Sequence, residues 1–305
     1  MTDQSSNLRA AILMTVGMAA FTVNDTCMKA VTATLPLYQS IFLRGLIATM
    51  AIAVIARGAG ALQWRMSRRD VGFVGLRLVG EVGSTVTFLT ALKHMPLANL
   101  SAIMQSMPLA LTLAAAVVLR EGIGWRRLSA ISLGFAGVLL IVRPGTEGFD
   151  RFSVLGLLCV ALVVLRDLAT RFVSSAVSSQ TVALCASASV TLSAALVLPF
   201  TEWHPPTLRE GLLLAGAAGF LILGYLTVVA ATRGGDIGVV APFRYTALLF
   251  AILLGWAIFG TLPDGLTLLG GALIVISGIY TLYRSRRVAP RTIAADPEGD
   301  TPPPA

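Results

Sequence analysis

Charged residues are scarce in this sequence. Only 12% of its 305 residues are Asp, Glu, Lys or Arg, whereas 56% are hydrophobic, and the mean hydropathy is +0.82. A soluble domain typically has about 25% charged and about 45–50% apolar residues. The shortage of charge therefore excludes a soluble enzyme or binding domain and indicates a membrane protein.

Cysteine and histidine are almost as rare. The three cysteines, Cys27, Cys159 and Cys185, fall inside apolar runs without a Cys-x-x-Cys pair, which argues against a disulfide framework. Two histidines, His94 and His204, are too few for a histidine-built metal centre. A glycine-rich phosphate loop is also missing, so ATP is not the expected driver. We expect neither a metal nor a cofactor.

Long apolar runs, by contrast, fill most of the chain. A helix that spans a bilayer needs about 20 mostly apolar residues. Ten runs meet this requirement, and they leave no room for a soluble domain: 10–30, 37–57, 71–92, 96–119, 126–143, 152–172, 180–200, 208–230, 237–259 and 265–283. The sequence therefore predicts an all-α integral membrane protein with ten transmembrane helices.

The basic residues follow alternate runs. The net charge of +8 gathers after the second, fourth, sixth, eighth and tenth runs, at Arg57, Arg65, Arg68, Arg69, Arg120, Arg126, Arg127, Arg171, Arg233, Arg284, Arg286, Arg287 and Arg291. Loops rich in Lys and Arg stay in the cytoplasm. Residues 1–8 and both termini are then cytoplasmic, and the charge reports topology rather than a nucleic-acid partner. Residues 285–305, basic and then Pro-rich and acidic, are predicted to be a disordered tail.

An internal repeat divides the chain into halves. Asp25, Lys29 and Val31 recur 142 residues later as Asp167, Arg171 and Val173, and "LGFAGVLLIVRP" at 133–144 resembles "LIVISGIYTLYR" at 273–284. We predict two five-helix repeats, at 9–143 and 152–284. Because five is odd, the second repeat enters the membrane upside down, as in many secondary transporters.

Charged pairs four residues apart occur in three of the runs. They are Asp25 with Lys29, Arg77 with Glu81, and Asp167 with Arg171, and i, i+4 spacing places each pair on one side of a helix. For the pairs of Asp25 and Asp167, interfacial anchoring with local pairing is one explanation, and a gate that closes one face of a pathway is the other. For Arg77 and Glu81, the alternatives are a self-satisfied ion pair and a substrate or proton role. Arg166 has no partner in this pattern.

Other polar residues lie at membrane depth, where such side chains usually line a cavity or pair with one another. Pro242, in "VVAPFRYTALLF", and Pro108, beside Gln105, predict breaks that free backbone polar groups. Simple kinks, and a structural link between helices for Arg44, are the alternatives. The candidate substrate-binding residues are Asn24, Arg44, Glu81, Gln105, Tyr225, Pro242, Arg244 and Tyr245.

Several stretches resemble the drug/metabolite transporter superfamily, in its form with two EamA domains. They are "FLRG" at 42–45, "ALKHMPLANLSAIMQSMPLALTLAAAVVLRE" at 91–121, "LGFAGVLLI" at 133–141, "APFRYT" at 241–246 and "GGALIVISGIY" at 270–280. One departure stands out: many second halves carry a glutamate that matches Glu121, where this chain has Thr261 and Leu262. "VLRDLATR" together with "APFRYT" looks most similar to bacterial proteins grouped with riboflavin transporters.

The resemblance implies a multi-pass inner-membrane transporter of small organic metabolites. A central cavity would lie between the helices at 10–30, 71–92, 96–119, 152–172, 208–230 and 237–259. Riboflavin uptake by alternating access is the specific expectation, with Arg244 on a polar or anionic group and a tyrosine stacked on a ring. Export of amino acids or related metabolites is the alternative, and an integral membrane enzyme is a remote one. The sequence leaves the coupling ion open, and a homodimer is compatible with it.

Overall fold

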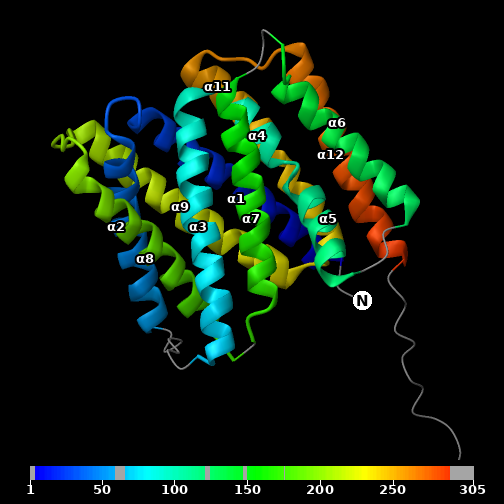
Figure 1. Cartoon of the computed structure of the whole chain (residues 1–305), viewed down its shortest axis with the longest axis horizontal. Coiled ribbons are helices and arrows are strands. Elements are labelled where there is room, and N and C mark those ends of the chain that lie inside the picture. The colour runs from blue at the N-terminus through cyan, green and yellow to red at the C-terminus, as the bar shows by residue number, and fades with distance from the viewer. Residues whose placement is uncertain (1–3, 59–65, 121–123, 147–149, 175, 289–305) are drawn as a thin grey trace, which may run out of the picture.

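The protein is a bundle of helices in a computed structural model that describes residues 4–58, 66–120, 124–146, 150–174 and 176–288. The helices are α1 (Gln4–Val31), α2 (Leu37–Gly58), α3 (Arg68–His94), α4 (Leu97–Met104), α5 (Met107–Leu119), α6 (Trp125–Val142), α7 (Arg151–Arg171), α8 (Ser179–Val197), η1 (Leu198–Phe200), α9 (Leu208–Gly234), α10 (Ile237–Val240), η2 (Ala241–Tyr245), α11 (Thr246–Phe259) and α12 (Gly265–Val288). Figure 1 shows their arrangement.

In these ranges ten helical segments are long and apolar enough to cross a membrane, as predicted. The predicted helix at 96–119 is divided into α4 and α5, and the one at 237–259 into α10, η2 and α11. Part of the predicted tail is helical, because α12 continues to Val288. The rest of the tail, residues 1–3 and Glu121 lie outside the described residues.

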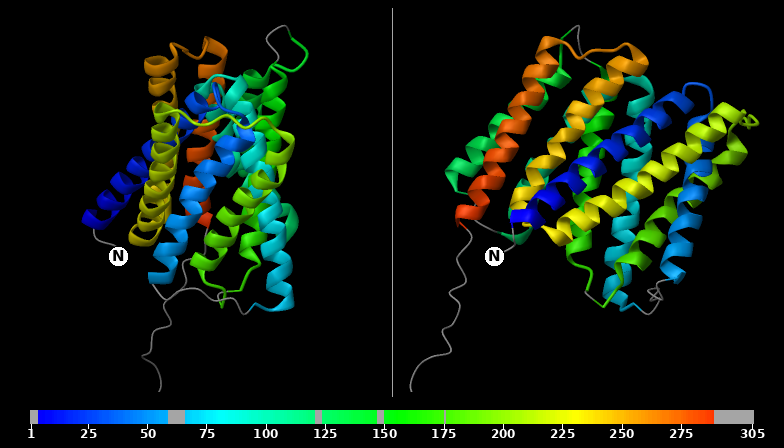
Figure 2. Two further views of the ribbon diagram at one scale, coloured as in Figure 1. Left: turned by 90° about the vertical axis from the view of Figure 1, so that its left-hand side faces the viewer. Right: turned by 180° about the vertical axis from the view of Figure 1, so that it is seen from behind.

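Each main packing contact joins helices from different predicted repeats. The most extensive ones pair α1 with α9, α3 with α7, α2 with α8, and α6 with α12 (Figure 2). If α1 corresponds to α7 and α3 to α9, exchanging the repeats turns the first pair into the second. It leaves the other two pairs unchanged. This pattern supports the inverted repeat, which stays a prediction.

Individual contacts follow the same pattern. The hydroxyls of Thr49 and Thr191, 142 residues apart, hydrogen bond at 3.1 Å, so equivalent positions touch each other. Ser67 and Thr207 each accept a hydrogen bond from the amide of an acidic residue three positions later, Asp70 and Glu210. Such N-caps satisfy amides that a helix leaves unpaired at its start. Both halves therefore begin their third span with the same device.

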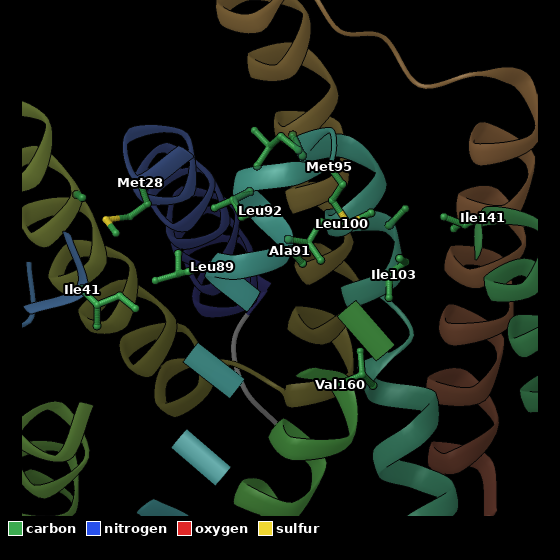
Figure 3. Packing of buried hydrophobic residues seen from close by; sticks show 14 of the residues in the cluster. Met28, Ile41, Leu89, Ala91, Leu92, Met95, Leu100, Ile103, Ile141 and Val160 are labelled. Carbon is green, nitrogen blue, oxygen red and sulfur yellow. The ribbon is translucent and has the colours of Figure 1, made fainter. Parts of the chain in front are cut away.

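The two ends of the bundle differ in how they are packed. The lower end in Figure 1, where α2 and α7 end and α3 begins, holds a group of exposed arginines that includes Arg57, Arg68, Arg69 and Arg171, and we call it the arginine-rich end. The opposite end holds the α1–α2 and α3–α4 connections, and a single large buried cluster there includes Met28, Leu89, Leu92, Met95, Leu97, Leu100 and Leu214 (Figure 3).

Towards the arginine-rich end, two smaller clusters of described buried residues are separate from this one. One contains Met14, Met18 and Ala231, from α1 and α9, and the other contains Ala115 and Leu168, from α5 and α7. The most extensive apolar packing among the described residues thus lies at the opposite end.

Small residues let α6 and α12 approach closely. A Cβ atom on Gly270 would lie 2.5 Å from the carbonyl oxygen of Gly137, and one on Gly137 would lie 2.6 Å from that of Gly270. At the opposite end, Arg143 donates a hydrogen bond to Asp264 and, with further hydrogen bonds from Thr267, lowers the pKa of that carboxyl to about 2.

We expect Gly270→Ala to destabilise the protein, because the new methyl group meets a backbone atom and the two helices must separate. Overpacking of this kind costs about 1–3 kcal/mol. Gly219→Ala on α9 is the matched control, since a Cβ there meets nothing within 4 Å. Thermal unfolding of both variants in one detergent provides the measurement. Equal melting temperatures for the two variants would contradict the close contact.

Candidate functional site

Two helix breaks meet in the middle of the bundle. The first separates α4 from α5 at Gln105 and Ser106, where Pro108 follows at the start of α5. The second lies at η2, which contains Pro242. Proline lacks the amide that would continue a helix, so both breaks leave carbonyl groups without their usual partner. The positions of both breaks agree with the sequence prediction.

Gln105 ties the two breaks together. It is 8% exposed, and its Nε2 donates to the carbonyl oxygens of Tyr245, at 3.2 Å, and Arg244, at 3.4 Å. These two hydrogen bonds join the break between α4 and α5 to the backbone at the start of α11. Gln105 therefore holds the backbone that carries Arg244 rather than standing free to bind a solute.

Tyr245 is a packing residue in this structure. It is 5% exposed and lies against Gly278 of α12, where any Cβ atom would overlap its hydroxyl oxygen. That hydroxyl has no hydrogen-bond partner among the described residues. The predicted stacking of this ring on a substrate finds no open face here.

A charged cluster links α3 to α7. Glu81 lies 3.4 Å from both Arg77 and Arg166, and Arg166 Nε donates to Asp167 at 2.9 Å. Arg77 also donates to the hydroxyl of Thr170 at 2.7 Å. The Arg77–Glu81 pair was predicted. The position of Arg166 is explained by its contacts with two carboxylates, one of them on another helix.

A second polar group links α1 to α2. Arg44, 8% exposed, donates to Asn24 Oδ1 at 3.3 Å, and Asn24 donates to Asp25 at 2.9 Å. Arg44 and Asp25 also interact electrostatically. One nitrogen of Arg44, Nε, is buried without a partner in the described structure. Arg44 thus links two helices. A structural link of this kind was one of the two alternatives that the sequence left open for it.

Cys159 lies between these two groups. Its thiol donates to the carbonyl of Ser84 at 3.4 Å, and it interacts electrostatically with both Arg166 and Asp25. From the sequence, Cys159 was judged only unlikely to form a disulfide. Its distance of seven positions from Arg166 places both on one face of α7, and that spacing was the available signal.

Arg244 differs from the other arginines at membrane depth. Its side chain is exposed, and it makes no hydrogen bond or ion pair with the residues that the structure describes. Asp167 attracts it and Arg166 repels it, so it faces the α3–α7 cluster. The region as a whole contains the guanidinium groups of Arg44, Arg77, Arg166 and Arg244 and the carboxylates of Asp25, Glu81 and Asp167.

Three predicted residues lie apart from this region. Lys29 donates to backbone carbonyls at the opposite end, Arg171 is exposed at the arginine-rich end, and Tyr225 on α9 is 46% exposed. The recorded contacts thus do not include the predicted local pairs of Lys29 with Asp25 and Arg171 with Asp167. An apolar hollow on α9 at Gly216 and Leu223 is also separate, and its wall offers a polar solute no partner.

Comparison with known proteins places these features in a family context. The model of the EamA-like transporter family matches residues 8–143. The pseudopaline exporter of Pseudomonas aeruginosa is 30% identical over 283 residues, covering 92% of this chain and 98% of the exporter. The riboflavin transporter of Vibrio cholerae is 28% identical, covering 87% of this chain and 89% of that protein.

Another relative with a different name matches over a similar extent. An S-adenosylmethionine uptake transporter of Rickettsia prowazekii is 26% identical and covers 89% of this chain and 92% of its own length. A crystal structure that is 22% identical superimposes with a TM-score of 0.60 over 92% of this chain and 98% of that one, which shows a shared fold.

The contact between Tyr245 and Gly278 can be tested by a double-mutant cycle. We expect Gly278→Ala to cost about 1–3 kcal/mol through overpacking. Tyr245→Phe alone should be nearly neutral, because the hydroxyl has no recorded partner. In the double variant, part of the loss should be recovered, since the overlapping oxygen is gone while the ring carbon behind it remains. Thermal unfolding of the four proteins measures this coupling, and a Gly278→Ala penalty that is unchanged by Tyr245→Phe would contradict it.

Proposed function

Since the chain belongs to the EamA-like transporter family, we propose that it is a secondary transporter that works by alternating access in the bacterial inner membrane. Membership makes it a multi-pass membrane transporter of small molecules rather than an enzyme. The proposal adds a mechanism and a substrate class: a small organic metabolite that carries an anionic group.

Arg244 is the observation that carries the substrate class. Among the described residues at membrane depth, the other three arginines each contact a carboxylate or a side-chain amide, whereas Arg244 has no such contact. A charged group at this depth is costly unless it is paired or faces water. An anionic substrate group supplies the missing partner, and a guanidinium binds a carboxylate or phosphate through two parallel hydrogen bonds.

The surroundings of Arg244 favour a defined binding geometry. Gln105 holds its backbone, and Tyr245 anchors the same turn against α12. Because the backbone is already held, only the arginine side chain has to be ordered when a solute binds. Arg166 and Asp167 stand beside it, and a zwitterionic solute has a partner for each of its charges there.

Alternating access is supported by the pairing of helices across the two predicted repeats. Because α1 packs on α9 and α3 on α7, the units that move would each combine helices from both repeats. The ion pair of Glu81 and Arg166 joins α3 to α7 within one such unit. The hydrogen bond from Arg44 to Asn24 joins α2 to α1, beside the other unit. Two such units can tilt against each other about the breaks where Gln105 meets η2.

Riboflavin uptake is the competing substrate assignment, and its support is the relative from Vibrio cholerae. Riboflavin is uncharged at neutral pH and would use aromatic stacking, but Tyr245 is buried. The geometry therefore favours a carboxylate-bearing solute, whether it is taken up or exported.

Counterflow in proteoliposomes distinguishes these assignments. Labelled riboflavin, S-adenosylmethionine and a panel of amino acids would be tested against vesicles preloaded with the same unlabelled solutes. Saturable exchange of a carboxylate-bearing solute supports the proposal. Exchange of riboflavin alone would overturn the proposed anionic substrate class, although the protein would still be a transporter. If none of these solutes is exchanged, pseudopaline and other metabolites would be tested in the same assay.

We expect Arg244→Ala to lower the initial rate of transport at least about tenfold, because a hydrogen bond to a charged group contributes about 1.5–3 kcal/mol. Arg244→Lys should retain part of the rate, since it keeps the charge but not the paired geometry. Arg233→Ala, which removes an exposed cation from the last turn of α9, is the control. Size-exclusion profiles would establish that all variants are folded, and a wild-type rate for Arg244→Ala would remove the residue from the site.

A further inference from the structure

Lys29 fastens the opposite end of the bundle. Its ammonium group donates to the carbonyl oxygens of Leu92, at 2.7 Å, and Met95, at 2.8 Å, in the last turn and C-cap of α3. It also lies 5.6 Å from the centre of the Phe259 ring, at the end of α11. One side chain of α1 thus holds the ends of two other helices.

The chemistry suits such a fastening. The last carbonyls of a helix have no amide partner within the helix, and they carry the negative end of its dipole. A lysine supplies several donors and a positive charge to this position. The bonds form only while the ends of α1 and α3 are together, so they stabilise closure at this end.

The equivalent residue at the arginine-rich end makes no such bonds. Arg171 lies 142 positions after Lys29 and ends α7, but it is exposed and has no hydrogen bond or ion pair with any residue that the structure describes. At the offset of 140 that relates Ser67 to Thr207, the carbonyls equivalent to those of Leu92 and Met95 belong to Thr232 and Gly235, in the last turn and C-cap of α9.

Helix packing shows the same asymmetry. Where they come together, α1 packs against α3 and α4, whereas α7 has no comparable packing against α9 or α10 in the described structure. Apolar side chains close the opposite end and form two separate clusters towards the arginine-rich end. A protein with equivalent halves but unequal ends has the form expected of one state of an alternating-access cycle.

From these observations we infer that Lys29 and Arg171 are alternating latches on the two gates of the transporter. In the present state, Lys29 holds the extracellular gate closed by bonding the end of α3. In the other state, those bonds break, and the guanidinium of Arg171 bonds the carbonyls at the end of α9, closing the cytoplasmic gate. The inference rests on the proposed alternating access, and it assigns separate roles to two cations that lie outside the substrate site.

Thiol accessibility provides a test that needs no substrate. The three cysteines would be replaced by alanine and a reporter introduced by Leu89→Cys, which lies 2% exposed beneath the Lys29 contacts. A membrane-impermeant maleimide added outside intact cells would then report opening of the extracellular gate. Ala91→Cys, at 0% exposure, is a second reporter in case the first variant does not fold.

The two latches should shift labelling in opposite directions. Lys29→Ala should speed labelling at least about tenfold, because two charge-assisted hydrogen bonds of the closed gate are lost. Arg171→Ala should slow it, because the state with the extracellular gate open loses its latch at the other end. Lys29→Arg and Arg171→Lys keep a cationic donor and should restore rates near that of the parent. Lys93→Ala, which removes an exposed cation beside the α3 end, is the matched control.

The outcomes separate this inference from the proposed function. Opposite shifts support the latches even if no tested solute is transported. Equal labelling of the parent, Lys29→Ala and Arg171→Ala would overturn the latches while leaving the counterflow result intact. Faster labelling in both variants would show a general loosening of the structure and would also overturn the alternation.

Discussion

Backbone carbonyls that a helix cannot satisfy are the constraint on which much of this structure depends. In lipid they must find donors on other helices. Lys29 supplies such donors where α3 ends, and Gln105 bonds the backbone where η2 interrupts the ninth span. Each of these side chains comes from a different helix than the carbonyls it bonds. The breaks and ends of helices are therefore also the points where the helices are held together.

The charged side chains at membrane depth also join helices to one another. Glu81 brings Arg77 and Arg166 together and so joins α3 to α7, whereas Asn24 stands between Arg44 and Asp25 and joins α1 to α2. These contacts mostly satisfy one another. Arg244 is the exception among the described residues, and it lies on a helix break held by Gln105, which is why we propose it as the contact for a solute.

Much of the architecture could be predicted from the sequence, because long apolar runs determine spanning helices and prolines within them determine breaks. The ten spans and the breaks beside Pro108 and Pro242 were predicted on this basis. The partners of Lys29 and Asp167 were not, because i, i+4 spacing considers only residues that lie one helical turn apart. Lys29 bonds a helix 63 residues away, and Asp167 pairs with the adjacent Arg166. The burial of Tyr245 likewise depends on Gly278, whose role only tertiary packing reveals.

The pairing of helices across the two halves also has a consequence for biosynthesis. Chains are made from the N-terminus, so α1, α2 and α3 enter the membrane well before α7, α8 and α9 exist. The partner of Glu81 on α7, Arg166, is translated 85 residues after it. The close contact of α6 at Gly137 cannot form until α12, the last helix, has been inserted. During this interval the early helices need temporary partners, such as lipid headgroups, water or insertion machinery. A chain that stops after the first five spans would leave these polar groups without their native contacts. Proteases that degrade incomplete membrane proteins could recognise such unpaired groups.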